Sequence, residues 1–225
     1  MRYVLSFFNI LLFCTCATSQ LNLSVLYSIG RTSPEVQQNI LDKYNQNRPW
    51  LQNPFEEMKW LNGYGFGLRY RIEGLAFDIK WENQVDRLKA SGANPDNNNA
   101  AFEQELYFKL TTYGVGIESF FSDKFSIHAS LDFNKVRYRT ELTGVPDRFE
   151  LASNWAMGST FSIGYNFVGG GLMHVSLRPY MHISWTNHDL TDLDTALNPN
   201  TSRPLDPQEE FLNYGLKIIF YNGQW

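Results

Sequence analysis

The chain has 225 residues, a formal net charge of −4 and an aromatic content of 16%. A mildly acidic chain of this size has no basic character of the kind that binds nucleic acid, so we expect no nucleic-acid partner. No stretch beyond the N-terminus approaches the apolar run that a transmembrane helix requires, which leaves strands as the means of crossing a membrane.

Residues 1–19 are predicted to be a cleavable signal peptide. Arg2 provides a positive start, Val4–Phe13 form a short apolar core, and Ala17–Ser19 give the small-x-small cleavage motif. A buried N-terminal helix is the alternative, but it would leave the cleavage motif unexplained. Both cysteines lie in this segment, so the mature chain can form neither a disulfide framework nor a thiolate metal site. We expect no metal and no cofactor.

Residues 20–225 are predicted to form one β-barrel domain, because seven stretches alternate clearly between apolar and polar residues with a period of two, and an eighth does so in part. In 62–72, Tyr64, Phe66 and Leu68 fall on one face, and glycines and arginines fall on the other. A helix cannot produce this pattern. The eight apolar faces begin at Leu21, Tyr64, Leu75, Tyr113, Phe125, Trp155, Met173 and Leu212. The opposite faces are rich in glycine and small polar residues, as expected for the narrow interior of an eight-stranded barrel.

Two irregularities are expected within these strands. The apolar residues of 106–110 are out of phase with the apolar face that starts at Tyr113, which predicts a bulge near Thr111. Pro179 cannot donate a hydrogen bond to a neighbouring strand, so a bulge or bend is expected there as well.

The connections between the strands are sorted by length. Three are short, at 73–74, 122–124 and 168–172, and four are long, at 31–61, 89–103, 142–153 and 187–208. Short and long connections alternate strictly, which is typical of outer-membrane barrels with short periplasmic turns and long extracellular loops. Asn53 and Asn198 are therefore expected to be exposed outside the cell, and Asp123 to face the periplasm.

The last strand carries a local motif, Asn213-x-Gly215-x-x-Ile218-x-Phe220. It resembles the polar-x-Gly-x-x-apolar-x-aromatic signal that the barrel-assembly machinery reads, although four residues follow Tyr221, where many such strands end. Together with the strand pattern and the connections, this motif makes the mature chain resemble the OmpA/OmpX-type barrels over essentially its whole length, without a peptidoglycan-binding domain.

The resemblance implies an all-β fold, an eight-stranded antiparallel up-and-down transmembrane β-barrel in the outer membrane of a Gram-negative bacterium. It also implies two partners, the outer-membrane lipid and the barrel-assembly machinery during biogenesis. Barrels of this family act as structural, adhesive or resistance proteins, and some are enzymes, so the fold by itself does not choose the function.

Charged residues on the polar faces would be enclosed in the barrel. The turn at 73–74 opposes Arg69 to Asp78, and we expect these two side chains to form a direct ion pair. The turn at 122–124 likewise opposes Glu118 to His128. The predicted lumenal charged network comprises Arg69, Arg71, Asp78, Lys80, Glu82, Glu118, His128, Asp132, His174, Arg178, His182 and Lys217. A proton path or polar pore is one interpretation, but eight strands leave little interior room, so we favour a structural network.

The pattern His-x-Ser occurs three times, at 128–130, 174–176 and 182–184. It resembles the lipid A deacylase barrels, in which such a pair forms a triad with a carboxylate. All three copies are predicted to face inward, whereas a lipid-cleaving site has to reach acyl chains. We therefore favour a non-enzymatic barrel with no catalytic residue, and keep a lipid-modifying barrel enzyme as the alternative.

The connection 31–61 is predicted to be partly helical. Pro34 can occupy the first helical position, and Val36, Ile40 and Tyr44 follow at helical spacing. The segment also holds apolar residues that are unusual in a solvated loop, namely Trp50, Leu51, Phe55, Met58 and Trp60. They are either a docking surface for an envelope protein partner or a lid packed over the barrel mouth. The protein would then act as a structural subunit or as a binding module through its extracellular loops.

Overall fold

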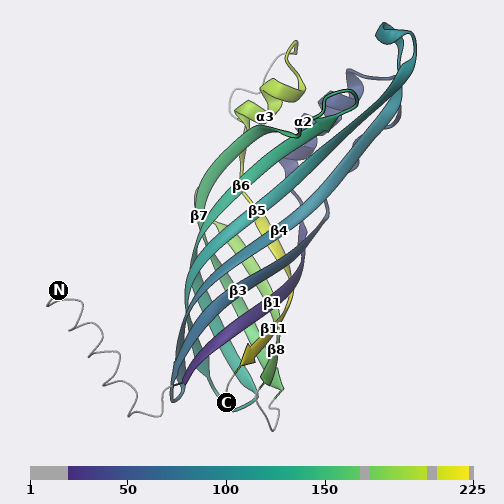
Figure 1. Ribbon diagram of the computed structural model, residues 1–225. Coiled ribbons are helices and arrows are strands. Elements are labelled where there is room, and N and C mark those ends of the chain that lie inside the picture. Colours follow the sequence, from purple (N-terminus) through teal and green to yellow (C-terminus); the bar gives the residue numbers. More distant parts are fainter. Residues whose placement is uncertain (1–19, 168–172, 202–206, 223–225) are drawn as a thin grey trace, which may run out of the picture.

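Eight long strands form the body of the protein in the computed structural model, which describes residues 20–167, 173–201 and 207–222 (Figure 1). The predicted signal peptide and the predicted short turn at 168–172 lie outside the described residues. The barrel strands are β1 (Gln20–Thr32), β3 (Trp60–Ile72), β4 (Leu75–Asn94), β5 (Ala100–Phe120), β6 (Phe125–Leu142), β7 (Phe149–Phe167), β8 (Met173–Ser184) and β11 (Leu212–Asn222).

The strands close into a barrel with a simple up-and-down order. Each barrel strand pairs antiparallel with its neighbours in the chain, and β1 pairs with β11 to complete the ring, with Val25 opposite Phe220. β4 and β5 are joined in register along almost their whole length. The predicted all-β class and the eight-stranded antiparallel up-and-down barrel are confirmed.

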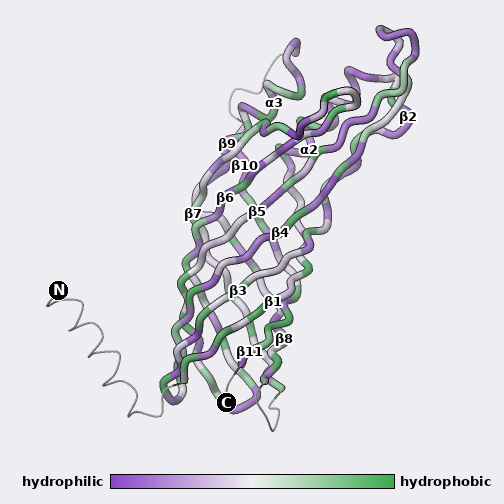
Figure 2. The backbone as a smooth tube through the Cα atoms, viewed as in Figure 1, coloured by the Kyte–Doolittle hydropathy of each residue, from purple (hydrophilic) through white to green (hydrophobic). Residues whose placement is uncertain are grey.

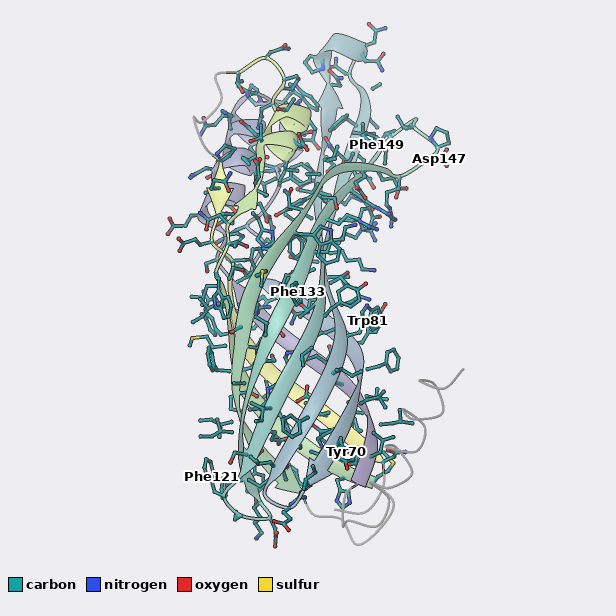
Figure 3. All side chains as sticks on the ribbon, turned by 90° about the vertical axis from the view of Figure 1, so that its left-hand side faces the viewer. Tyr70, Trp81, Phe121, Phe133, Asp147 and Phe149 are labelled. Atoms are coloured by element: carbon teal, nitrogen blue, oxygen red, sulfur yellow. The ribbon has the colours of Figure 1, made fainter. Side chains whose placement is uncertain are left out.

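The two faces of the wall differ as the alternation predicts. Leu21, Leu23 and Val25 of β1 point outward and are at least half exposed, whereas Asn22 and Ser28 point inward and are buried. Figure 2 shows the alternation along the strands, and Figure 3 shows rings such as Phe133 on the outer wall. Because exposed apolar side chains surround the wall on every strand, this surface is suited to lipid and not to water.

Two of the four connections predicted to be long are largely strand. β4 and β5 stay paired as far as Asn94 and Ala100, so the predicted loop 89–103 shrinks to a tip with a short 3-10 helix, η2 (Pro95–Asn97). The predicted loop 142–153 likewise shrinks to 143–148. The β4–β5 hairpin consequently rises well above the rest of the barrel (Figure 1).

The predicted bulge near Thr111 is wrong. The register of β5 with both β4 and β6 continues unbroken through this residue. Leu106, Phe108 and Leu110 share the inward face with Thr112, and all four are buried. What changes along β5 is therefore the polarity of the interior, which is polar below Thr112 and apolar above it.

Pro179 interrupts one ladder without shifting it. Pairing of β8 with β7 stops after Ser162 opposite Tyr180 and resumes at Tyr165 opposite Leu177 in the same register. Pairing of β8 with β11 continues through Pro179. The proline thus removes a hydrogen bond on one side only, as its missing N–H requires, and no bulge forms.

A cap covers the end of the barrel opposite the short turns. We use this term for the described residues of 33–59 and 185–211. It contains α2 (Glu35–Gln46), β2 (Leu51–Asn53), β9 (His188–Asp189), α3 (Thr191–Leu197) and β10 (Gln208–Glu209). β2 extends the sheet beside β4, and β9 pairs with β10. Among the described residues, neither helix has the length and apolar character needed to cross a membrane.

Candidate functional site

In the lower half of the barrel interior, on the side of the short turns, buried carboxylates form ion pairs with cationic side chains of other strands. Glu118 is fully buried on β5; one of its oxygens lies 3.4 Å from Arg69 of β3 and the other 2.5 Å from Arg178 of β8. Glu82 of β4 lies 2.6 Å from Lys217 of β11. These contacts cross the lumen, so they tie together strands that are not neighbours in the wall.

A second group surrounds Asp132, which is also fully buried. Its carboxylate lies 3.1 Å from Lys80 and 3.3 Å from Nδ1 of His182, and it accepts a hydrogen bond from Thr160. Lys80 also donates to the Ser130 hydroxyl at 2.8 Å. Each polar atom of the group therefore has its partner inside the barrel, which such burial requires.

The predicted Arg69–Asp78 ion pair is wrong, although the predicted register is right. Arg69 stands opposite Asp78, but its guanidinium reaches past β4 to Glu118. Asp78 contacts Nε2 of His128 at 2.8 Å instead. The contact passes over Gly116, where an added Cβ would collide with both side chains, so glycine is needed at this position.

The remaining predicted network residues lie at the edges of these groups. His174 is buried near the lower end of β8. Arg71 lies at the rim, where it donates to the Glu73 carbonyl at 3.1 Å and stands 4.2 Å from the centre of the Phe120 ring. A cavity among these side chains measures about 40 Å³, which is room for one or two water molecules. Among the described residues, the side chains of the network therefore occupy most of the space around this cavity.

The upper half of the interior is an apolar core shared by the wall and the cap. The strands contribute Leu88, Ala90, Leu106, Phe108, Leu110, Val136, Tyr138 and Ala152, and the cap contributes Ile40, Leu41, Tyr44, Phe55, Met58, Leu190, Leu193, Leu197 and Phe211. The rings of Phe108 and Phe211 stack with centroids 5.6 Å apart. Each large apolar side chain buried here contributes about 1.5–3 kcal/mol, so the cap is firmly attached.

Polar contacts fix the cap in one orientation. Tyr138 of β6 donates to the side-chain oxygen of Gln37 at 2.7 Å, and Tyr44 donates to Gln104 of β5. The backbone N–H of Gln37, in the first turn of α2, donates to the Glu209 carboxylate at 2.9 Å. Burial raises the pKa of Glu209, and the backbone N–H groups of α2 oppose that rise. The N-terminus of α2 has no side-chain cap from its own residues. Glu209, which is distant in the sequence, caps it instead.

The residues of the predicted docking loop are divided by the structure. Phe55 and Met58 are buried in the apolar core, so the docking interpretation is wrong for them and the lid interpretation holds. Leu51 packs against that core, and Trp50 meets Phe102 edge-on with ring centroids 5.1 Å apart. Trp60 belongs to β3 and is 54% exposed on the outer wall. Phe55 and Met58 are buried because the interior of the upper barrel is apolar and the cap covers it.

Asn198 is a further correction. It is 1% exposed, and its amide donates to the Ile40 carbonyl at 3.1 Å and to Asp194 at 3.0 Å. It therefore joins α3 to α2 and does not lie on the outer surface. One signal in the sequence pointed to the buried cap, namely the apolar residues of 106–110 on an otherwise polar inward face. No pattern indicated that the described residues of 185–211 form the second half of the cap.

Comparisons with known proteins return structures only. No protein-family model and no curated protein sequence matches the chain. Ail, the attachment invasion locus protein of Yersinia pestis, in complex with the heparin analogue sucrose octasulfate, is 9% identical with a TM-score of 0.48, over 90% of this chain and 98% of that chain. Neisserial surface protein A is 10% identical with a TM-score of 0.43, over 91% and 97% of the two chains.

The strand count, the closure between β1 and β11, the filled polar lumen and the apolar outer wall together decide the fold. The fold is that of the OmpA/OmpX-type small barrels. In a barrel of this kind the lumen is too narrow to serve as a channel unless side chains move aside.

The three His-x-Ser pairs lie on the inside of this barrel. His128, His174 and His182 are between 3% and 6% exposed. His128 and His182 contact Asp78 and Asp132 within the network. The wall separates these side chains from any acyl chain outside, as a structural role requires.

The residues of the predicted barrel-assembly signal follow the two faces of β11. Asn213 is buried and donates to the Gln84 side chain at 2.6 Å, and Gly215 lies opposite Gly30 of β1. Ile218 and Phe220 lie on the outward face. The motif thus presents its apolar residues on the outer wall.

The stability of the cap is expected to fall as the medium is acidified from pH 6.5 towards pH 4. Burial lowers the pKa of His188 to about 4, and its ring packs edge-on against Phe211. Between pH 6.5 and pH 4, His188 is protonated when the cap is open and neutral when the cap is closed. Protonation therefore favours the open cap in this range. Protease cleavage within 33–59, followed from pH 7.5 to pH 4.5, measures this.

The matched control is His188→Phe, which keeps Glu209 and therefore keeps its opposite pH dependence, since a raised carboxyl pKa makes acid stabilising. The difference between the two proteins isolates the histidine. An identical pH profile for both would contradict the prediction.

Proposed function

We propose that the protein is a non-enzymatic outer-membrane barrel of a Gram-negative bacterium that works through the outside of its capped end. It acts as a structural subunit or as a binding module there. Residues 1–19 direct it to the envelope, and the β11 motif is read by the barrel-assembly machinery. The observation that carries the proposal is that, among the described residues, ion pairs hold the lower interior together and an apolar core joins the upper interior to the cap. The chemistry left for a partner is therefore on the outer surface.

The length of the strands supports a working surface above the membrane. At about 3.3 Å per residue and a tilt near 45°, β4 rises roughly 30 Å between Trp81 and its end at Asn94. Strands built only to span a bilayer do not need this extension. An envelope protein partner would meet the β4–β5 hairpin and the 143–148 connection, because Phe55 and Met58 are covered.

Single cysteines test the proposed location. Asn53 and Asn200 are exposed at the capped end, and Asp123 is exposed in a short turn. We expect cysteines at the first two positions to react with a membrane-impermeant maleimide in intact cells, and a cysteine at Asp123 to react only after lysis. The native cysteines do not interfere, because both lie within the predicted signal peptide. Strong labelling at Asp123 in intact cells would contradict the proposed orientation.

A further inference from the structure

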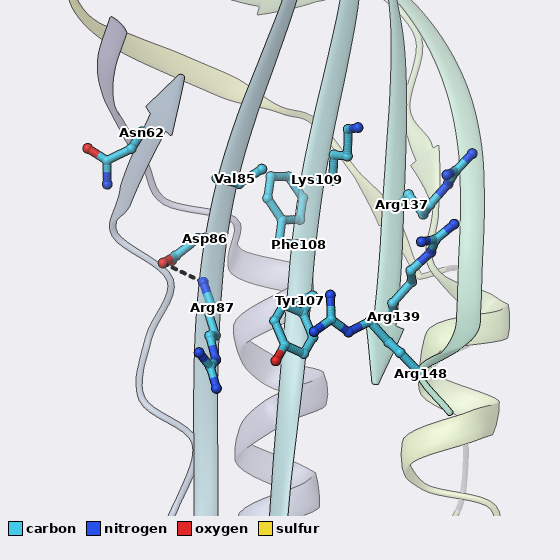
Figure 4. A pocket seen from close by; sticks show the side chains of 10 residues that line it. All are labelled: Asn62, Val85, Asp86, Arg87, Tyr107, Phe108, Lys109, Arg137, Arg139 and Arg148. Atoms are coloured by element: carbon cyan, nitrogen blue, oxygen red, sulfur yellow. Dashed lines mark hydrogen bonds between the residues drawn. The ribbon is translucent and has the colours of Figure 1, made fainter. Parts of the chain in front are cut away.

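A basic pocket of about 530 Å³ opens on the outer wall near the capped end (Figure 4). It is formed by β3, β4, β5, β6 and the 143–148 connection. Five cations line it, Arg87, Lys109, Arg137, Arg139 and Arg148, against the single lining carboxylate of Asp86. Tyr107 stands between two of them, with the guanidinium carbons of Arg148 and Arg87 at 3.5 and 5.2 Å from its ring centre.

The carboxylates around the pocket do not balance these cations. Arg87 pairs with Glu105, and Arg148 with Glu141 at 3.2 Å. Arg137 and Arg139 share Glu150, at 3.0 and 3.8 Å. Among the described residues no carboxylate lies within ion-pair distance of Lys109, which sits between Val85 and Arg137 in register. The centre of the pocket therefore keeps a positive charge that can attract an anion.

An apolar groove of about 490 Å³ lies on the same strands, on the side of the short turns. It is lined by rings and aliphatic side chains of the outer wall, including Phe66, Leu68, Trp81, Tyr113, Val115 and Phe133. Trp81, Tyr113 and Phe133 are in one row, because each stands opposite the next in register. Lys109 is four residues beyond Tyr113 on β5, so it lies roughly 9 Å above this aromatic row.

We propose that the groove and the pocket are one binding site for a phosphorylated glycolipid of the outer leaflet, with its acyl chains in the groove and its phosphates on Lys109, Arg137 and their neighbours. This rests on the proposed location in the outer membrane. Arginine and lysine bind phosphate through charge-assisted hydrogen bonds. Charge directly above an aromatic row, and an apolar groove directly below it, match the order of headgroup and acyl chain across the leaflet surface. A soluble polyanion would use only the upper half of the site.

The phosphate half is tested by titrating the purified full-length barrel in detergent with diphosphorylated lipid A, and counting bound lipids by native mass spectrometry. Lys109→Gln combined with Arg137→Gln should weaken binding tenfold or more, since two charged phosphate contacts are lost. Lys124→Gln removes the same charge in an exposed turn at the other end and should leave binding unchanged. Heat-modifiable gel mobility verifies that each variant has folded.

The acyl half is tested by filling the groove. Val115→Trp should weaken lipid A binding while leaving inositol hexakisphosphate, a soluble polyanion, bound as before. Ile163→Trp is the matched control, because Val115 and Ile163 are both 59% exposed on the outer wall and only the first lines the groove. Dephosphorylated lipid A should bind weakly to the unchanged protein.

Two results would overturn the proposal. Equal lipid A affinity in the unchanged protein and in the Lys109/Arg137 double variant would mean that the pocket holds no phosphate. Inositol hexakisphosphate binding as tightly as lipid A would mean that the site takes soluble polyanions. Because purified protein is used, these results are independent of the cysteine labelling, so the site and the cellular location can fail separately.

Discussion

Replacing Glu118 with glutamine is expected to lower the free energy of unfolding by about 3–5 kcal/mol, because it removes a charge that two buried cations share. Arg69 and Arg178 are 2% and 3% exposed, and both direct a guanidinium nitrogen at this carboxylate. An amide keeps the shape of the side chain but leaves their charge without compensation. Urea unfolding of the barrel in lipid vesicles, followed by tryptophan fluorescence, measures the change.

Glu56→Gln is the matched control, since it makes the same chemical change at an exposed position of the cap and should cost less than about 0.5 kcal/mol. Glu118→Gln and Arg178→Gln should also be strongly non-additive, because each removes the same contact. Additive losses would show that the two side chains do not interact.

Replacing Ile163 with arginine is expected to cost about 2–4 kcal/mol of folding free energy in lipid vesicles, because the charge would enter the hydrocarbon region. Ile163 is 59% exposed on the outer wall, opposite Ile127 of β6. With about 3.3 Å per residue and a tilt near 45°, it lies roughly 9 Å above Phe167 and 19 Å below Trp155. It therefore sits between the two aromatic edges of the apolar band. Leu177 is a weaker probe, since it is only partly exposed.

Asn200→Arg is the control, because Asn200 is exposed in the cap and the substitution leaves the charge in water. Asn198 would be a poor control despite its position in the same connection, since it is buried and bonded to α2. Equal and small costs at Ile163 and Asn200 would mean that the apolar wall does not contact lipid.

The wall of the barrel could be predicted from the amino-acid sequence alone. A period of two in apolar residues predicts which side chains face outward, and the short turns at 73–74 and 122–124 predict which residues stand opposite each other. For this reason Arg69 was correctly placed opposite Asp78, and Glu118 opposite His128. The residues of the interior network were predicted from the same alternation, because a charged residue on the inward face of a strand points into the barrel.

Which of these charged side chains form ion pairs could not be predicted from the sequence, because it depends on how the closed barrel brings the strands together. Register describes neighbouring strands, whereas Arg69 reaches Glu118 across β4, and Arg178 reaches it across the lumen. Closure of the barrel brings such groups together, and the length of the arginine side chain then outweighs adjacency in the sheet.

The position of the cap likewise depends on contacts between segments that are distant in the sequence. Apolar residues in 31–61 indicated either a lid or a docking surface, and the choice depended on what lay beneath them. The structure places Leu106 and Phe108 there, and it brings Leu193 and Leu197 of α3 against Ile40 and Leu41 of α2. No local pattern links segments so far apart in the chain. Their association follows from the shared need to remove apolar surface from water at the mouth of the barrel.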